Sequence, residues 1–272
     1  MGSRWLKFVG VWVVIALSLS GCASYRTHPE FKKRHKSLVS LASLNPDVEV
    51  LKVRFGGQNE ELHELYEPIK SWTLSEMEAV FKEKGYTWKP LDFDPKAIDS
   101  VPELRGSMFA VQELYKKLLV DIFKHRSGDF IYTVGAEINP IADWAESNAV
   151  VLVRWQAYKK SGGEIAKDMT MSVLLAAATL GSVVAIQAPS EAMAQVSVID
   201  GDTGEILWFH FNTDTWLDVA QEEHVRRAIK TLLKPFPKSA VVQAQEKAQR
   251  KQRERKSKSN IMPAGVPAGP AL

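Results

Sequence analysis

Residues 194–212, AQVSVIDGDTGEILWFHFN, contain two apolar runs on either side of a polar turn. The runs are Val196 to Ile199 and Ile206 to Phe211. Between them, Asp200 to Glu205 is rich in residues that accept positive φ and that hydrogen-bond to nearby backbone. This pattern predicts a β-hairpin. Apolar side chains cover most of both faces of its second strand, so we expect the hairpin to belong to a central sheet that is covered on both sides.

Three further runs upstream of the hairpin have strand patterns. They cover residues 47–55, 86–93 and 149–158. Pro90 in the second run favours a sheet edge or a bend, because proline cannot donate a ladder hydrogen bond. The third run begins with the uninterrupted apolar residues Ala149 to Val153, which predict a strand buried on both faces.

Four segments have helix patterns, with apolar residues at three-and-four spacing or capping residues at their ends. The first is expected over 71–84, with Thr73 and Glu76 as a capping box and Gly85 just after its end. The others are predicted from Ser100 to about residue 126, from Asn139-Pro140 to Trp144, and over 225–233 before Pro235 and Pro237. Strands and helices together predict an α/β (α+β) fold over residues 46–237: a single sandwich domain with a mixed β-sheet, a C-terminal β-hairpin and helices packed on the sheet.

The charge of the chain is divided between an acidic body and basic ends. The formal net charge is +3, but residues 46–237 have 20 basic and 29 acidic side chains. Residues 1–22 carry a net +2, residues 23–45 a net +4, and residues 238–272 a net +6. The single cysteine, Cys22, excludes an intrachain disulfide and a zinc site built on several cysteines.

The first 22 residues have the pattern of an export signal followed by a lipid attachment site. Arg4 and Lys7 precede an apolar run over residues 8–19, which is too short to cross a bilayer of about 30 Å as a helix. The run ends in Leu19-Ser20-Gly21-Cys22, which resembles the lipobox of bacterial lipoproteins. That resemblance implies a signal peptide over residues 1–21, cleavage between Gly21 and Cys22, and acylation of Cys22, for example by palmitate. Several acyl chains anchor a protein stably to a membrane.

Two basic segments flank the predicted domain. Residues 22–45, with the run Lys32-Lys33-Arg34-His35-Lys36, are expected to form a lipidated basic tether that is either a solvated linker or attracted to anionic headgroups. Residues 238–272 are expected to be a basic, mostly disordered tail, with a frayed helix over 241–258. In an exported lipoprotein we expect this tail to be solvated or to touch anionic envelope polymers, and we expect no nucleic-acid partner.

Residues 169–190 form an insertion of 22 residues without a charged side chain. Its length would just span a membrane, but its polar residues and many alanines make insertion marginal. A single crossing would also separate the hairpin from the strand at residue 150. Three interpretations remain open: a buried or packed helix, a segment that contacts a partner or the membrane surface, and a true membrane span. Small residues at Ala177, Gly181 and Ala185 would allow close helix packing.

The turn of the hairpin resembles three functional motifs but completes none of them. Asp202-Thr203-Gly204 matches the aspartic-protease tripeptide, but Glu205 follows it and no second copy exists. Asp200 and Asp202 begin like a calcium-binding EF-hand loop, but the twelfth position is Phe211. The phrase also resembles one repeat of a quinoprotein-type β-propeller, which needs several copies. The turn is therefore expected to be structural.

The remaining polar residues show no arrangement typical of catalysis. No metal-ligand spacing, nucleophile motif or phosphate-binding glycine loop occurs. Glu222 and Glu223 beside His224 are expected on the solvated face of a helix. The sequence thus assigns no catalytic, cofactor-binding or metal-binding residue, and a hydrolase would need a deep polar pocket at His210 or Asp202. The histidines considered were His28, His35, His63, His125, His210 and His224.

The order of elements, with the lipobox, resembles the domain shared by the TolB amino-terminal region, the curli-secretion lipoprotein and several envelope-accessory lipoproteins. The run from Asn148 to Val153 stands where those families have a small residue, Ala and Asp before an apolar strand, although here Ser147-Asn148-Ala149 replaces Gly-Ala-Asp. The segment from Val198 to Trp208 also contributes. The resemblance implies an α/β sandwich used for protein contacts.

We therefore expect a non-enzymatic accessory or assembly protein of the bacterial envelope, attached to the outer membrane through acyl chains on Cys22 and facing the periplasm. The outer membrane is expected because Ala23, rather than Asp, follows the cysteine. An envelope protein partner or a homo-oligomer is expected, and no cofactor. Two alternatives remain: an oligomeric channel or secretion component that uses residues 169–190, and a periplasmic hydrolase.

Overall fold

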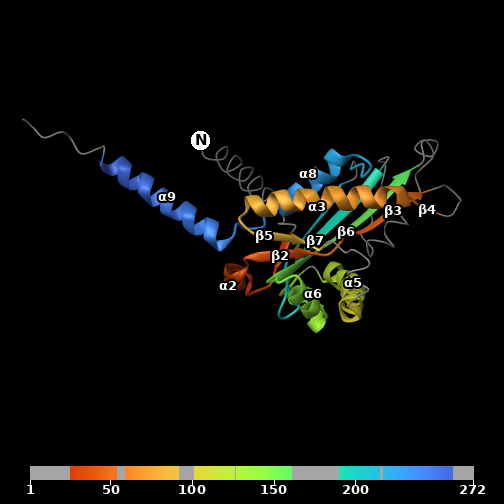
Figure 1. The fold of residues 1–272 in the computed structure, drawn as a ribbon. Coiled ribbons are helices and arrows are strands. Elements are labelled where there is room, and N and C mark those ends of the chain that lie inside the picture. Colours follow the sequence, from red (N-terminus) through yellow and green to blue (C-terminus); the bar gives the residue numbers. More distant parts are fainter. Residues whose placement is uncertain are drawn as a thin grey trace, which may run out of the picture.

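The computed structural model describes residues 25–53, 59–91, 101–125, 127–160, 190–214 and 217–259. The predicted signal peptide, Cys22 and residues 169–189 of the insertion lie outside these ranges. The described residues form one mixed sheet with helices on both of its faces (Figure 1). This arrangement confirms the predicted α/β sandwich.

The predicted hairpin lies beside the centre of the sheet. It consists of β7 (Ser190–Asp200) and β8 (Ile206–Asp214), which pair antiparallel through Val196 and His210. β7 also pairs antiparallel along β6 (Ala149–Lys160), and the short β1 (Tyr25–Thr27) pairs with the outer side of β8. Both strands of the hairpin therefore have a strand neighbour on each side.

Two short strands share the other side of β6. β2 (Ser40–Ser43) runs parallel to the start of β6, and β3 (Asp47–Val53) runs parallel to its second half. β5 (Thr87–Pro90) pairs parallel with β2 at the sheet edge, as Pro90 predicted, and β4 (Glu60–Glu61) pairs antiparallel with β3. β6 thus holds both halves of the sheet together.

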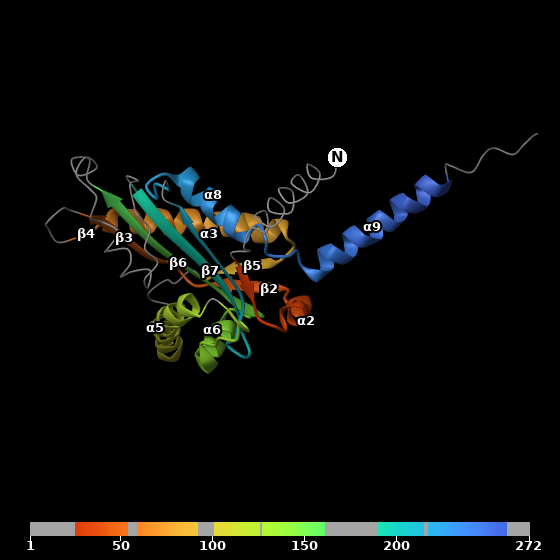
Figure 2. The same cartoon turned by 180° about the vertical axis from the view of Figure 1, so that it is seen from behind.

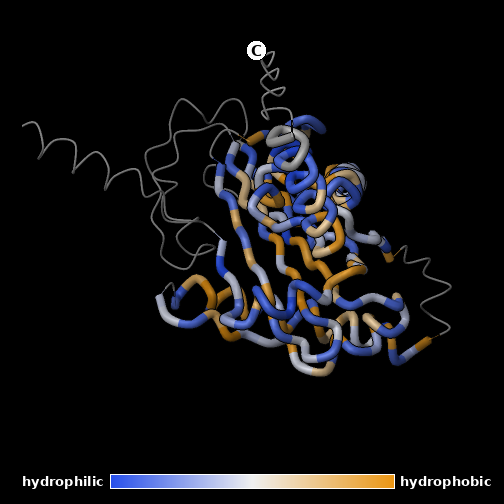
Figure 3. Tube along the Cα trace, turned by 90° about the vertical axis from the view of Figure 1, so that its left-hand side faces the viewer, coloured by the Kyte–Doolittle hydropathy of each residue, from blue (hydrophilic) through white to orange (hydrophobic). Residues whose placement is uncertain are grey.

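β6 is buried on both faces, as its apolar run predicted. Val151, Val153 and Trp155 point into one hydrophobic core, while Val150 and Leu152 point into the other. Side chains of a strand alternate between the faces of a sheet, so all residues of a continuous apolar run are buried only when both faces are covered. Figure 3 shows hydrophobic residues along the strands in the interior of the body.

Two helices cover each face of the sheet. α3 (Tyr66–Glu83) and α8 (Glu222–Leu233) pack side by side on one face, and α5 (Pro102–Lys124) and α6 (Asn139–Trp144) lie on the other (Figures 1 and 2). Three short helical turns join these elements: η1 (His35–Ser37), η2 (His63–Leu65) and η3 (Gly135–Ile138). The helices predicted at 139–144 and 225–233 are confirmed.

The start of α3 differs from the prediction, and its end agrees with it. The helix begins at Tyr66, so Thr73 lies inside it and makes no capping box with Glu76. Thr73 is buried, and its hydroxyl accepts a hydrogen bond of 3.0 Å from the indole of Trp155. At the other end Gly85 has φ +82°, and Tyr86 donates to the carbonyl of Phe81. This is the left-handed glycine termination that the sequence predicted.

The helix predicted from Ser100 is α5, although Ser100 itself lies outside the described residues. Pro102 is its first residue and Val101 its N-cap, without a side-chain capping bond. The predicted length agrees well with the helix, which ends at Lys124. Its buried residues line the second core: Leu104, Ser107, Val111, Tyr115, Leu119 and Ile122.

The predicted tether over residues 22–45 is wrong for the described residues 25–45. They contribute β1, α2 (Phe31–Arg34), η1 and β2 to the body. The physical reason is the apolar residues between the basic ones: Phe31, Leu38 and Leu41 are buried in the core beneath α3 and α8. The lysines of the basic run remain exposed around these apolar residues. The prediction of a linker gave weight to the charged residues and overlooked the apolar ones between them.

The C-terminal segment is also more ordered than predicted. Phe236 between the two prolines is 1% exposed and fills the core after α8. α9 (Ala240–Ser259) then projects away from the body as a helix (Figure 1), which confirms the helix predicted over 241–258, although it is continuous over this range. Residues 260–272 lie outside the described ranges. The side chains from Gln243 to Glu254 are exposed.

Replacing Thr73 by Val should destabilise the protein by about 1–3 kcal/mol, because the buried indole N–H of Trp155 would lose its acceptor while the volume of the side chain stays the same. Urea unfolding measures the difference. Thr73→Ser keeps the hydroxyl and is the matched control, with a smaller loss from the missing methyl group. Equal unfolding midpoints for Thr73→Val and the unmodified protein would contradict this role of the hydroxyl.

Candidate functional site

The hairpin turn is closed by the side chain of its first residue. Asp200 Oδ1 accepts hydrogen bonds from the backbone N–H groups of Asp202, at 3.1 Å, and Thr203, at 2.9 Å. The Thr203 hydroxyl donates to the same oxygen at 3.1 Å. The Asp200 carboxylate is therefore used to form the turn, in the manner of an Asx turn.

Arg34 of α2 binds the turn through both ends of its guanidinium group. Nη2 lies 2.8 Å from Asp200 Oδ2 and donates to the Thr203 hydroxyl at 2.6 Å, while Nη1 binds Glu205 Oε2. The hydrogen bond from Arg34 lowers the pKa of the Glu205 carboxyl below its ordinary 4.5. The Arg34 and Asp200 side chains are 16% and 14% exposed, so solvent screens this pair only in part. The N-terminal segment is thus fixed to the hairpin by charge.

Two further segments contact the backbone of the turn. Asn139 donates to the carbonyls of Gly201, at 2.9 Å, and Asp202, at 2.8 Å, instead of capping its own helix. Gly204 has φ +71°, and a Cβ at this residue would lie 2.0 Å from the carbonyl oxygen of Gly135. The turn is therefore structural, as the sequence predicted, and it also joins four segments, which the sequence did not predict. Asp202 is on its exposed surface.

The residues named for a hydrolase are not brought together in a polar pocket. His210 is 6% exposed on β8, and its Nδ1 lies 2.6 Å from the carbonyl oxygen of Leu232. Burial lowers its pKa, which favours the neutral ring. Neither pocket described below is lined by His210 or Asp202. Within the described ranges, no cluster of three or more His, Cys, Asp or Glu side chains has the proximity needed for a metal ion.

The other histidines of interest also make structural contacts. His35 is 6% exposed, with Nε2 at 2.6 Å from the Tyr86 hydroxyl, and its burial lowers its pKa. His224 accepts a hydrogen bond of 3.2 Å from the backbone N–H of Asp218. Glu222 and Glu223 are exposed at the start of α8, as expected for its solvated face.

A charged cluster on β3 and β6 was not anticipated from the sequence. Arg154 binds Asp47 at 3.1 Å and Glu49 at 3.2 Å, and its side chain is 14% exposed. Nearby on the same sheet face, the buried Tyr115 hydroxyl lies 2.8 Å from the Ser197 hydroxyl. The alternation of side chains along β6 places Arg154 on the same face as Leu152. Its two carboxylate partners lie on β3, and the sequence alone does not show that β3 pairs with β6.

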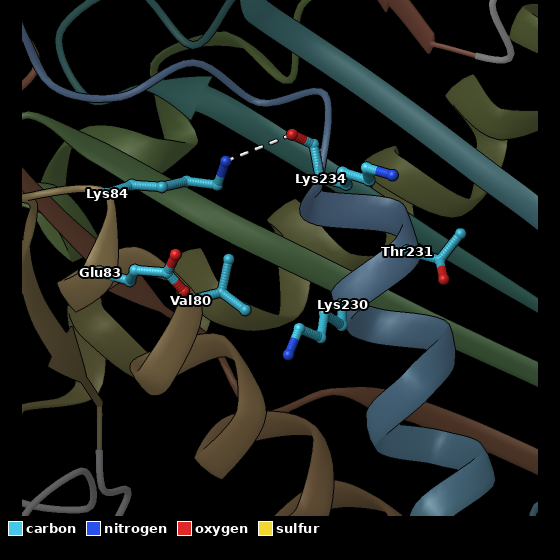
Figure 4. A pocket seen from close by; sticks show the side chains of 6 residues that line it. All are labelled: Val80, Glu83, Lys84, Lys230, Thr231 and Lys234. Carbon is cyan, nitrogen blue, oxygen red and sulfur yellow. Dashed lines mark hydrogen bonds between the residues drawn. The ribbon is translucent and has the colours of Figure 1, made fainter. Parts of the chain in front are cut away.

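A basic pocket lies between α3 and α8 (Figure 4). Its volume is about 400 Å³, and its walls carry three lysines and one glutamate: Lys84, Lys230, Lys234 and Glu83, with Val80 and Thr231. Lys84 donates to the carbonyls of Phe236, at 2.7 Å, and Lys234, at 3.3 Å, and so binds the C-terminal end of α8. Burial lowers the pKa of Lys84. No pattern in the sequence indicated this pocket, because its lysines come from segments far apart in the chain.

A second pocket of about 480 Å³ lies along the exposed side of α5, where it is lined by Pro102, Arg105, Gly106 and Phe109. The Phe109 side chain is 69% exposed. Leu114 on the same helix, Ile131 after it and Trp144 on α6 are also exposed. Apolar side chains in such positions are suited to a protein contact.

The edge strand β1 is fixed to helix ends from both faces of the sheet. Arg26 donates to the carbonyls of His125, at 2.7 Å, and Gly128, at 3.3 Å, just after α5, and its guanidinium lies 4.8 Å from the centroid of the Phe130 ring. The Tyr25 ring packs edge-on against His210 at 6.1 Å, and His210 contacts the end of α8. The first described residue is therefore part of a fixed surface.

Comparisons with known proteins give a distant structural likeness. No family model matches the chain, and no curated protein matches it. Among solved structures, two PelC dodecamers from Paraburkholderia phytofirmans, one of a variant, are similar over 74% and 73% of this chain and 88% of theirs. The identity is 8% in both cases, and the TM-scores are 0.34 and 0.35. A likeness of this degree identifies neither a family nor an assembly.

The described helices include none whose length and apolar character suit a membrane crossing. The insertion over residues 169–190 lies outside the described residues except for Ser190, which begins β7. Its three interpretations therefore stay predictions.

Replacing Gly204 by Ala should destabilise the protein by about 3 kcal/mol or more, because the new Cβ would collide with the Gly135 carbonyl at a residue of positive φ. Gly106→Ala, in the open middle of α5, is the matched control and should stabilise by about 0.5–1 kcal/mol. Thermal unfolding of both variants measures the contrast. Similar midpoints for the two would show that the turn is free to move away from Gly135.

Removing the charge of residue 34 should change how stability depends on pH. Because the pKa of Glu205 is lowered in the folded state, its contribution is present above the ordinary value of 4.5 and is lost as the pH falls through the folded value. Arg34→Gln should therefore be less stable than the unmodified protein at pH 7, with a difference that shrinks below about pH 4.5. Urea unfolding from pH 7 to pH 3 tests this. Lys82→Gln, from an exposed pair with Glu78, should show little difference at any pH.

Proposed function

We propose that this protein is a lipid-anchored, non-enzymatic accessory or assembly protein of the bacterial envelope, attached to the outer membrane and facing the periplasm. The observation that carries the proposal is the sequence Leu19-Ser20-Gly21-Cys22 at the end of an apolar run. A lone cysteine in that place fits acylation better than any other use, because it has no cysteine partner in the chain.

The fold is compatible with a lipid anchor at Cys22 that precedes the folded domain. The first described strand, β1, begins at Tyr25, three residues after Cys22, so an anchor at the cysteine would precede the described elements of the domain. Several of its charged and titratable groups join elements of the fold. Arg34 and Glu205 bind at the hairpin turn, and His35 and His210 are buried against Tyr86 and the end of α8.

An accessory role also needs a surface for a partner. The exposed apolar side chains on α5 and α6 supply one on the face of the sheet away from α3 and α8: Phe109, Leu114, Ile131 and Trp144. Phe109 borders the second pocket, where the neighbouring Gly106 leaves space for a side chain of another protein. The partner is an envelope protein or a second copy of this chain.

The alternative function is an oligomeric channel or secretion component. The observation that favours it is the uncharged insertion of residues 169–190, which joins two long central strands, β6 and β7. Deleting residues 169–189 would abolish detergent-resistant oligomers in that case. An accessory protein that contacts its partner through α5 and α6 would keep its partner after the deletion.

Acylation is tested by growing cells with an alkyne-bearing fatty acid and detecting the label on the purified protein. The unmodified protein should be labelled and should fractionate with outer membranes, because its acyl chains bury many methylene groups in the bilayer. Cys22→Ser should lose the label and leave the membrane fraction. Labelling that persists in the variant, or membrane attachment without labelling, would contradict the proposed anchor.

The accessory role is tested in the same cells with a photo-crosslinking residue at position 109. A crosslinked envelope partner or dimer should form from position 109 and not from position 52 on β3, which serves as the control. Recovery of monomer alone from both positions would count against an assembly function while leaving the anchor intact.

A further inference from the structure

The distance between the proposed anchor and the body is short. Three residues, from Cys22 to Tyr25, span at most about 11 Å even when fully extended. Tyr25 belongs to β1, whose backbone is paired with β8 from Tyr25 to Thr27. If Cys22 is acylated, the edge of the sheet at β1 must therefore lie close to the lipid headgroups. Because β1 is fixed in the body, this attachment keeps the β1 edge near the headgroups, while the orientation of the body depends on what that edge presents to them.

The helix ends beside β1 carry exposed basic side chains. Arg26 binds the carbonyls at the end of α5, where Lys124 and His125 are exposed. The Tyr25 ring packs on His210, which contacts Leu232 in the last turn of α8. Lys230 and Lys234 are exposed around that turn. Basic residues thus lie at the ends of both helices that flank this edge, one from each face of the sheet.

Acidic side chains gather at another part of the sheet. β4 is the outermost strand beyond β3, and the chain from it into α3 carries four exposed acidic side chains: Glu60, Glu61, Glu64 and Glu67. Figure 1 shows β4 at the end of the body away from α2 and β5.

We propose that the β1 edge, with the ends of α5 and α8 that flank it, is a docking surface for anionic phospholipid headgroups. This inference rests on the proposed acylation of Cys22. Each lysine near an anionic membrane surface favours association by about fivefold, so Lys124, Lys230 and Lys234 add an orientation to the anchoring that the acyl chains provide. Tyr25, 39% exposed, has the amphipathic side chain that favours the membrane interface.

A soluble anionic polymer would recognise the same charges. The headgroups are favoured because the covalent connection holds Tyr25 within about 11 Å of Cys22 at all times, so the bilayer has a high effective concentration at this surface. The basic residues of α9 have no such constraint, because that helix projects from the body (Figures 1 and 2).

The test uses the acylated full-length mature protein in vesicles of phosphatidylcholine and phosphatidylglycerol. Since Cys22 is the sole cysteine and its thiol would be blocked by acylation, Thr231→Cys and Glu64→Cys each provide one site for a fluorophore. We expect headgroup-attached nitroxide lipids to quench the label at 231 at least threefold more than the label at 64. High salt, or vesicles of phosphatidylcholine alone, should remove most of the difference.

Charge reversal supplies the matched comparison. Lys230→Glu with Lys234→Glu should lower the ratio of docked to undocked protein by about 25-fold or more and reduce quenching at 231 to the level at 64. Lys52→Glu with Lys70→Glu changes the net charge equally, on β3 and α3, and should leave the quenching unchanged. Unfolding midpoints of both variants check that they remain folded.

The outcomes separate this inference from the function it rests on. Mass analysis of the N-terminal peptide reports whether Cys22 is acylated, and an unacylated cysteine would overturn the proposed function. Two results would overturn the docking surface alone, provided that the protein is acylated. One is equal quenching at the two positions, and the other is quenching at 231 that does not change when Lys230 and Lys234 are replaced by Glu. A third result would also contradict the inference: the two lysine substitutions weaken binding to a soluble anionic polysaccharide, while the labels at 231 and 64 are quenched equally. The surface would then bind a polymer and not the headgroups.

Discussion

The constraint on which the structure depends is the burial of β6 on both faces and along both edges. Its apolar residues need two cores, and its backbone needs a partner on each side. β7 meets this need along the whole strand, while β2 and β3 divide the other side between them. The two helix layers follow, since each core needs a cover. Trp155 shows the consequence at one residue: it is fully buried and hydrogen-bonded to Thr73 in the middle of the covering helix.

Charge in this protein has two separate uses. In the interior of the fold, Arg34 joins the N-terminal segment to the hairpin turn, and Arg154 joins two parallel strands. These groups are partly shielded from water and compensated by carboxylates, so they hold elements together without offering an open site. On the surface, basic side chains lie at the ends of α5 and α8, and acidic side chains lie on β4 and at the start of α3. The proposed docking surface uses only basic side chains of the second set.

The sequence predicted the parts whose signal is local. The hairpin, the run at Ala149 to Val153, the glycine at 85 and the prolines after α8 each report a short-range requirement, and the structure confirms them. The errors arose where distant residues decide the outcome. Thr73 is a residue type that often caps helices, but here its hydroxyl accepts a hydrogen bond from Trp155. Residues 25–45 were predicted to be a linker because of their basic residues, although Phe31 and Leu41 are buried in the core. The basic pocket combines side chains from α3 and α8, a proximity that no pattern in one segment contains.

The pairing of β1 with β8 has a consequence for how the chain folds. β1 is synthesised among the first residues, but Tyr25 lies opposite His210, on the last strand of the sheet. The sheet therefore cannot close until most of the polypeptide is available, and a contact between residues so far apart is slow to form. During that interval the first strand has no partner, and the hairpin has an open edge of the kind that invites aggregation.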